Sequence, residues 1–132
     1  GSAWYVSGGR STTGKLYADA GAEYVFSSYT NAGGVPLSFE TVFDKAQDAD
    51  VWLMKYNHPT DKTYKSLQED YAPYANFKAF KDKNIYYCNT AYRPYYEDFP
   101  FHPDRVLKDL IKIFHPSLLP EYELKYFSKL AE

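Results

Sequence analysis

Short apolar runs alternate with stretches of helical periodicity along the chain. The runs at residues 3–6, 23–26, 51–54 and 85–88 predict four strands. The run at 51–54 is continuously apolar, which is typical of a strand covered on both faces. Glycine-rich or polar segments follow these runs, including predicted loops at 27–35 and after 88.

Between the strands, apolar residues recur every three or four positions. Phe39, Val42, Phe43 and Ala46 share one face of a helix that Ser38 caps. The same periodicity and capping signals predict helices over residues 11–20, 38–46, 64–71, 76–84, 103–114 and 121–130.

Alternating strands and helices predict a three-layer α/β fold. Crossover connections favour a mostly parallel central sheet with helices on both faces. The 132 residues suit a single domain, 1–132. Ligands in such folds sit beyond the carboxyl ends of the strands, here at residues 7–10, 56–59 and 89–96.

The composition argues against several functional classes. A net charge of −2 with mixed signs argues against a nucleic-acid binder, which carries a basic face. No apolar run is long enough for a membrane span. Cys88 is the only cysteine, so an intrachain disulfide and a cysteine-based zinc site are both excluded. Aromatic residues make up 20% of the chain, with 15 tyrosines, which suits a recognition surface as well as a core.

The segment Gly9 to Lys15 matches most of a phosphate-binding loop, with a glycine, four free positions and Gly-Lys. Leu16 stands where the magnesium-binding Ser or Thr belongs. Asp50 begins its predicted strand, whereas the assisting carboxylate of such sites ends one. A small nucleotide-binding α/β protein is therefore an alternative interpretation, and a glycine turn lining a cleft is the favoured one.

The richest candidate site is "NTAYRPYYEDF", residues 89–99, at the carboxyl end of a predicted strand. Arginine pairs with carboxylates or stacks on planar groups, and tyrosines wall large flat ligands. A protein-interaction module that uses this tyrosine-rich loop is a further alternative. His58, His102 and His115 have no helical partner at metal-ligand spacing, so no metal site is predicted, although a ferric site of Tyr and His stays open. No nucleophile motif is present, and we expect no enzymatic activity.

Several segments taken in order resemble a known family. They are "AWYVSGGRSTTGKLYADAGAEYVF", "VPLSFETVFDKAQDADVWLM", "AFKDKNIYYCN" and "HPDRVLKDLIKIFHP". Together they resemble the C-terminal lobe of periplasmic substrate-binding proteins of the helical-backbone class, which serve ABC importers of ferric siderophores, haem and cobalamin. The resemblance covers nearly the whole chain and rests on order and spacing.

The resemblance implies a monomeric two-lobe protein with the ligand held between the lobes. This chain would then supply the second lobe, and a missing N-terminal lobe would carry the export or lipoprotein signal of a bacterial periplasmic or cell-surface protein. Glu40 matches the family glutamate that docks onto the membrane permease. No resident cofactor is implied, because the chelate is cargo. The ligand-facing positions are Arg10, Tyr56, His58, Tyr92, Arg93, Tyr95 and Tyr96.

Overall fold

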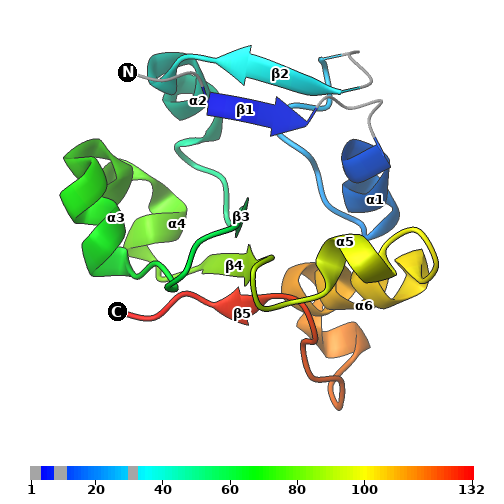
Figure 1. Cartoon of the computed structure of the whole chain (residues 1–132). Coiled ribbons are helices and arrows are strands. Elements are labelled where there is room, and N and C mark those ends of the chain that lie inside the picture. Colours follow the sequence, from blue (N-terminus) through cyan, green and yellow to red (C-terminus); the bar gives the residue numbers. More distant parts are fainter. Residues whose placement is uncertain (1–3, 8–11, 30–32) are drawn as a thin grey trace.

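The computed structural model describes residues 4–7, 12–29 and 33–132 of the chain. It has a mixed α/β fold in which two small sheets are flanked by helices (Figure 1). The helices are α1 (Thr12–Asp19), α2 (Phe39–Ala46), α3 (Tyr64–Asp70), α4 (Lys78–Lys81), α5 (Tyr95–Asp98) and α6 (Pro103–Phe114), with single 3-10 turns η1 (Ala72–Asn76) and η2 (Pro116–Leu118).

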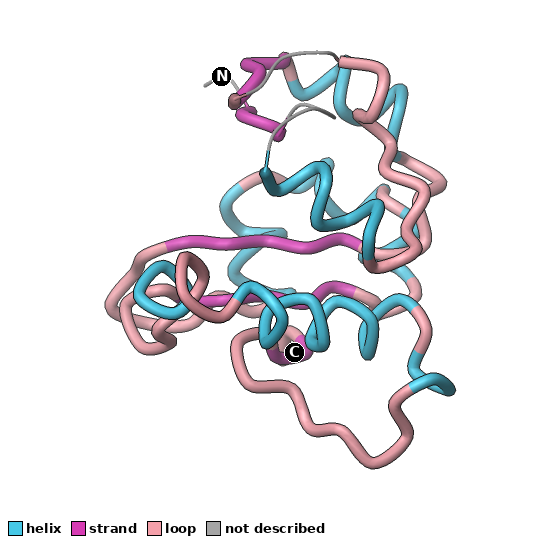
Figure 2. Tube along the Cα trace, turned by 90° about the vertical axis from the view of Figure 1, so that its right-hand side faces the viewer, coloured by secondary structure: helices cyan, strands magenta, loops and turns pink. Residues whose placement is uncertain are grey.

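The strands form two separate sheets. In the first, β1 (Trp4–Ser7) pairs antiparallel with β2 (Gly34–Leu37). In the second, β3 (Trp52–Tyr56) pairs in parallel with β4 (Ile85–Asn89), and β5 (Ser128–Lys129) adds to β4 antiparallel. Seen from the side, the β1–β2 pair lies beyond the three-stranded sheet, at one end of the molecule (Figure 2).

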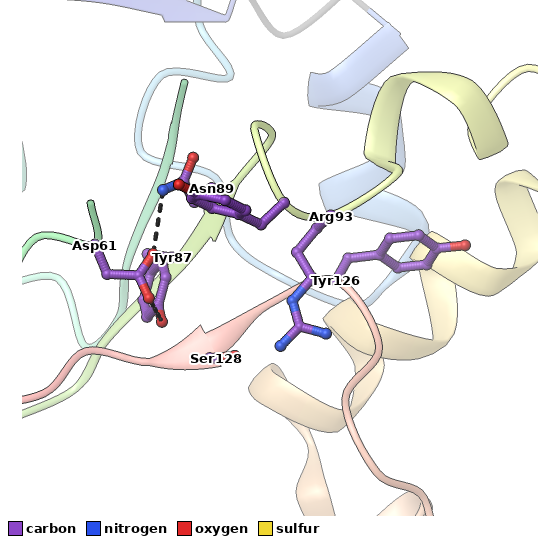
Figure 3. A pocket seen from close by; sticks show the side chains of 7 residues that line it. Asp61, Tyr87, Asn89, Arg93, Tyr126 and Ser128 are labelled. Carbon is purple, nitrogen blue, oxygen red and sulfur yellow. Dashed lines mark hydrogen bonds between the residues drawn. The ribbon is translucent and has the colours of Figure 1, made fainter. Parts of the chain in front are cut away.

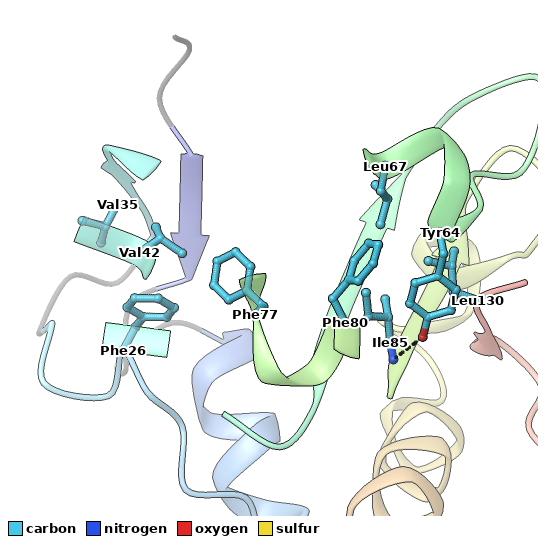
Figure 4. Close-up of a cluster of buried hydrophobic side chains, with 9 residues drawn as sticks. All are labelled: Phe26, Val35, Val42, Tyr64, Leu67, Phe77, Phe80, Ile85 and Leu130. Atoms are coloured by element: carbon cyan, nitrogen blue, oxygen red, sulfur yellow. Dashed lines mark hydrogen bonds between the residues drawn. The ribbon is translucent and has the colours of Figure 1, made fainter. Parts of the chain in front are cut away.

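Two hydrophobic clusters cover the two faces of the three-stranded sheet. Alternate side chains of a strand point to opposite faces, so Trp52 and Met54 join one cluster while Leu53 joins the other. The first cluster contains Ile85 beside Phe80 of α4 and side chains of α3, and it extends to Val35 of β2 (Figure 4). The second contains Leu16 of α1, Cys88 of β4, and Val106, Leu110 and Ile113 of α6. The predicted α/β class with helices on both faces is therefore confirmed.

The sheet is less parallel than predicted. Among the strand pairs of the described residues, β3–β4 is parallel, whereas β1–β2 and β4–β5 are antiparallel. The predicted strand at 23–26 is wrong, because this segment is irregular and ends in a turn, with Phe26 buried in the first cluster. The predicted loop at 27–35 ends instead in β2, which begins at Gly34.

The predicted helix at 121–130 is also wrong. The buried carboxylate of Asp109 on α6 accepts hydrogen bonds from the backbone N–H groups of Lys125, Tyr126 and Phe127. Those N–H groups point at one side chain, so the segment turns toward the sheet and continues into β5. This turn places Tyr126 and Ser128 beside the carboxyl end of β4.

Local capping fixes the helices that flank the sheet. The Ser38 hydroxyl accepts from the N–H of Thr41 and begins α2, as predicted. Thr63 and Ser66 form a reciprocal capping box at the start of α3. Within the described residues, no helix is long and apolar enough to cross a membrane.

Candidate functional site

The carboxyl ends of the parallel pair β3–β4 lie side by side, because Tyr56 is in register with Asn89. The loops that leave these two residues therefore meet at one edge of the sheet, which we call the carboxyl edge. Ligand sites of open α/β sheets lie at this position. Both loops belong to the segments in which the sequence predicts ligand contacts.

Asn89 joins the two loops. Its side chain is 1% exposed, and its Oδ1 accepts from the N–H of His58 at 3.2 Å and of Ala91 at 3.1 Å. Its Nδ2 donates to the carbonyl of His58 at 2.9 Å and to the Asp61 carboxylate at 3.1 Å. Because all four contacts come from one amide group, Asn89 fixes the position of both loops.

A pocket of about 160 Å³ opens beside the Asn89 side chain (Figure 3). The Arg93 guanidinium reaches into it toward the strand that carries Ser128. On the opposite wall, the Tyr87 hydroxyl donates to Asp61 at 3.0 Å. No carboxylate of the described residues lies within ion-pair distance of Arg93. The pocket lining comprises Asp61, Tyr87, Asn89, Tyr92, Arg93, Tyr126 and Ser128.

Tyr56 and His58 support the wall of the pocket. The Tyr56 ring stacks on Tyr87 with 5.8 Å between centroids, and its hydroxyl accepts from the N–H of Lys62 at 2.9 Å. Burial raises the pKa of Tyr56 to about 12, so it is a neutral phenol at physiological pH. His58 is exposed, and its Nδ1 lies 2.9 Å from the Thr60 carbonyl.

The tyrosines of residues 92–96 divide into buried and exposed members. Tyr92 is 64% exposed, and its hydroxyl donates to the carbonyl of Pro59. Tyr96 is 60% exposed. Tyr95 is 4% exposed and packs between Phe99 and Phe127, so it holds the loop against the core. Tyr92, Arg93 and Tyr96 are therefore the members of this segment that a ligand reaches directly.

Two further predicted residues are Arg10 and Glu40. Arg10 falls outside the described residues. Glu40 is exposed on the first turn of α2, where a carboxylate also complements the helix dipole. Its role in docking stays a prediction.

The described part of the phosphate-loop segment does not favour magnesium chemistry. Lys15 is exposed, but Leu16 is 7% exposed and packs into the second core cluster. Asp50 pairs with Lys78 at 2.6 Å, before the start of β3 and so at the opposite end of the sheet from the carboxyl edge. Over residues 4–7, 12–29 and 33–132, no group of three or more His, Cys, Asp or Glu side chains could hold a metal ion.

Sequence reasoning missed four residues of the pocket. Asp61 and Tyr87 read as ordinary loop and strand positions, and Tyr126 and Ser128 lie in the segment predicted as a helix. The alternation of β4 could have placed Tyr87 on the same face as Asn89, because the two are separated by one residue. No local signal marks Ser128.

Comparison with solved structures identifies the fold. The TroA-like periplasmic binding protein FepB from Veillonella parvula superposes with a TM-score of 0.72 at 14% sequence identity, over 96% of this chain and 44% of that one. The chain has the fold of one lobe of a TroA-like periplasmic binding protein. In this lobe, the pocket and the exposed tyrosines occupy the carboxyl edge of the three-stranded sheet.

Two curated proteins of Methanocaldococcus jannaschii are similar in sequence. The uncharacterized lipoprotein MJ0878 is 29% identical over 107 residues, which is 81% of this chain and 24% of that protein. The uncharacterized lipoprotein MJ0872 is 29% identical over 126 residues, which is 95% of this chain and 31% of that protein. The chain thus spans about a quarter to a third of the curated relatives it matches. No family model matches the chain.

Proposed function

We propose that the chain is the C-terminal ligand-binding lobe of a substrate-binding protein for an ABC importer. The cargo is a metal chelate: a ferric siderophore, haem or cobalamin. The lobe performs no reaction, and it captures its ligand between itself and an N-terminal lobe. The observation that carries the proposal is the position of Arg93, Tyr92 and Tyr96 at the carboxyl edge of a lobe with the TroA-like fold.

The chemistry of this edge suits such a cargo. Exposed tyrosine rings offer flat apolar faces to an aromatic or macrocyclic ligand. Arg93 has no carboxylate partner within ion-pair distance in the described part of the chain, so its guanidinium is available to an anionic group of the ligand. Tyrosinate oxygen is also a hard donor for ferric iron.

The proposed partners and location follow from the same assignment. The curated relatives bear the name lipoprotein. We therefore place the whole protein outside the cytoplasm, as a periplasmic or lipid-anchored monomer that meets a membrane permease. The exposed carboxylate of Glu40 on α2 would pair with a basic residue of that permease.

Fluorescence quenching tests the proposal on the chain itself. Titration with ferric catecholate, ferric hydroxamate, haemin and cyanocobalamin is expected to give weak, saturable quenching with at least one chelate, because one lobe provides only part of the contacts. Arg93→Gln should weaken binding of an anionic chelate about tenfold, the size expected for one charge-assisted hydrogen bond. Arg105→Gln, an exposed arginine on α6, is the matched control and should change little.

The proposed function and the nucleotide alternative make opposite predictions for magnesium-ATP. Under the proposed function, magnesium-ATP should give no quenching, and Lys15→Ala should leave chelate binding unchanged. Failure of all four chelates, or magnesium-ATP binding that Lys15→Ala abolishes, would contradict the proposed function.

A further inference from the structure

Lys55 on β3 is half-buried at the carboxyl edge and contacts aromatic rings. Its ammonium lies 4.6 Å from the centroid of the Tyr95 ring and 5.9 Å from that of Tyr96. Strand alternation places its side chain on the same face as Leu53, toward the second core cluster. The neighbouring Tyr56 points to the opposite face, where it stacks on Tyr87.

No carboxylate of the described residues forms an ion pair with Lys55. The residues outside the described ranges contain no Asp or Glu. Burial accordingly lowers the pKa of Lys55 from its usual value. The other lysines of this region are either exposed or paired, so Lys55 is unusual in being half-buried beside rings alone.

Retaining a cation at this position does not favour folding. An ammonium partly removed from water loses hydration, and ring faces restore only part of it. An apolar side chain of the same length would pack against the tyrosines without that loss. The arrangement is therefore better explained by a partner that supplies negative charge from outside the chain.

One of the two rings that Lys55 contacts, that of Tyr96, is 60% exposed. Arg93, the second cation of this edge, lies in the loop just before α5, the helix that carries Tyr96. Both Lys55 and Arg93 act on Cys88 at the end of β4, each lowering the pKa of a thiol that burial raises to about 11. Lys55 is in register with Cys88, and the N–H of Arg93 donates to the carbonyl of Asn89 at 3.0 Å, so both cations belong to the carboxyl edge.

We propose that Lys55, Tyr95 and Tyr96 form an anion-binding subsite, which works with Arg93 to select metal chelates of net negative charge over neutral ones. The inference deepens the proposed function and rests on it. Complexes of catecholate or carboxylate ligands carry such charge, whereas tris-hydroxamate complexes of trivalent iron are neutral. Of the cargo classes proposed above, the subsite favours an anionic ferric siderophore or the propionates of haem.

Two gallium complexes provide the test, because gallium(III) matches the charge of ferric iron and is diamagnetic. Gallium tris-catecholate carries three negative charges and gallium tris-acetohydroxamate carries none. The chain, labelled with carbon-13 at lysine Cε, is titrated with each complex and followed by NMR. The Lys55 resonance is expected to shift and saturate with the catecholate complex. The resonance of Lys45 on α2, whose ammonium lies 5.7 Å from the centroid of the Tyr29 ring, should not shift.

Lys55→Met is the informative variant, because its thioether packs well against aromatic rings and the fold should persist. It should weaken binding of the catecholate complex about tenfold and leave the hydroxamate complex within about twofold, with no loss of stability in urea. Lys45→Met is the control and should affect neither complex. Equal losses for both complexes, or no change with either, would overturn the subsite while leaving the proposed function intact. Absence of binding by both complexes would overturn the subsite, and the proposed function falls with it only if haemin and cyanocobalamin also fail to bind.

Discussion

Replacing Asp109 by alanine is expected to lower the free energy of unfolding by roughly 3–5 kcal/mol. The Asp109 carboxylate is fully buried and accepts four donors: the Tyr122 hydroxyl at 2.5 Å and the N–H groups of Lys125, Tyr126 and Phe127. Alanine leaves these donors without their acceptor, and the N–H groups of Tyr126 and Phe127 are buried. The segment that leads into β5 should detach first, since Asp109 is what holds its turn.

Urea unfolding measures this loss. Asp109→Asn keeps the shape of the side chain, but its NH₂ group faces donors and should still be strongly destabilising. The matched control is Glu123→Gln, an exposed change in the same segment, which should stay within about 0.5 kcal/mol of the wild-type protein. A loss below about 1 kcal/mol for Asp109→Ala would show that the buried carboxylate does not organise the C-terminal segment.

Asn89→Ala is expected to cost about 2–3 kcal/mol and to loosen both loops of the carboxyl edge. The substitution removes four hydrogen bonds and leaves the N–H groups of His58 and Ala91 without their acceptor. Amide hydrogen exchange should therefore quicken at these two residues more than in α6. Chelate binding should weaken as well, because the pocket wall formed by Asp61 is no longer fixed.

Asn57→Ala is the control for this prediction. Asn57 is exposed and lies one residue before His58, so it tests whether any change in this loop has the same effect. Its exchange rates and stability should match the wild-type protein. Unchanged exchange at His58 and Ala91 in Asn89→Ala would contradict the role of Asn89 as the link between the loops.

The sequence predicts the elements that carry their own periodicity. The apolar face of α6 recurs over several turns, and its predicted bounds, 103–114, match the structure. The strands β3 and β4 are predicted within one or two residues, because they are short apolar runs between clear breaks. These elements are specified by residues close together in the chain.

Elements that depend on distant partners are missed. β2 forms because it pairs with β1, whereas residues 23–26 join neither of the two sheets. The 121–130 segment has helical periodicity, but Asp109, more than ten residues earlier, takes its N–H groups. Local pattern carries no information about such a contact.

The residues of the candidate site also fall into two groups, those that the sequence predicts and those that only tertiary structure brings to the site. The carboxyl-edge rule directs attention to Tyr56 and the loop of Arg93, and the structure places both beside the pocket. Asp61, Tyr126 and Ser128 join it only through tertiary structure. Lys55 attracts no attention in the sequence, because a single lysine near a strand end is normally solvated.

Residue-level mapping of chelate binding tests directly whether the ligand binds at the carboxyl edge. The chain labelled with nitrogen-15 is titrated with the anionic gallium tris-catecholate complex, and amide shifts are followed by NMR. We expect saturable shifts concentrated at Tyr92, Arg93, Tyr96 and the end of β3, with α2 and the η2 turn unaffected. Shifts spread evenly over the surface, or confined to residues away from the carboxyl edge, would contradict binding at this edge.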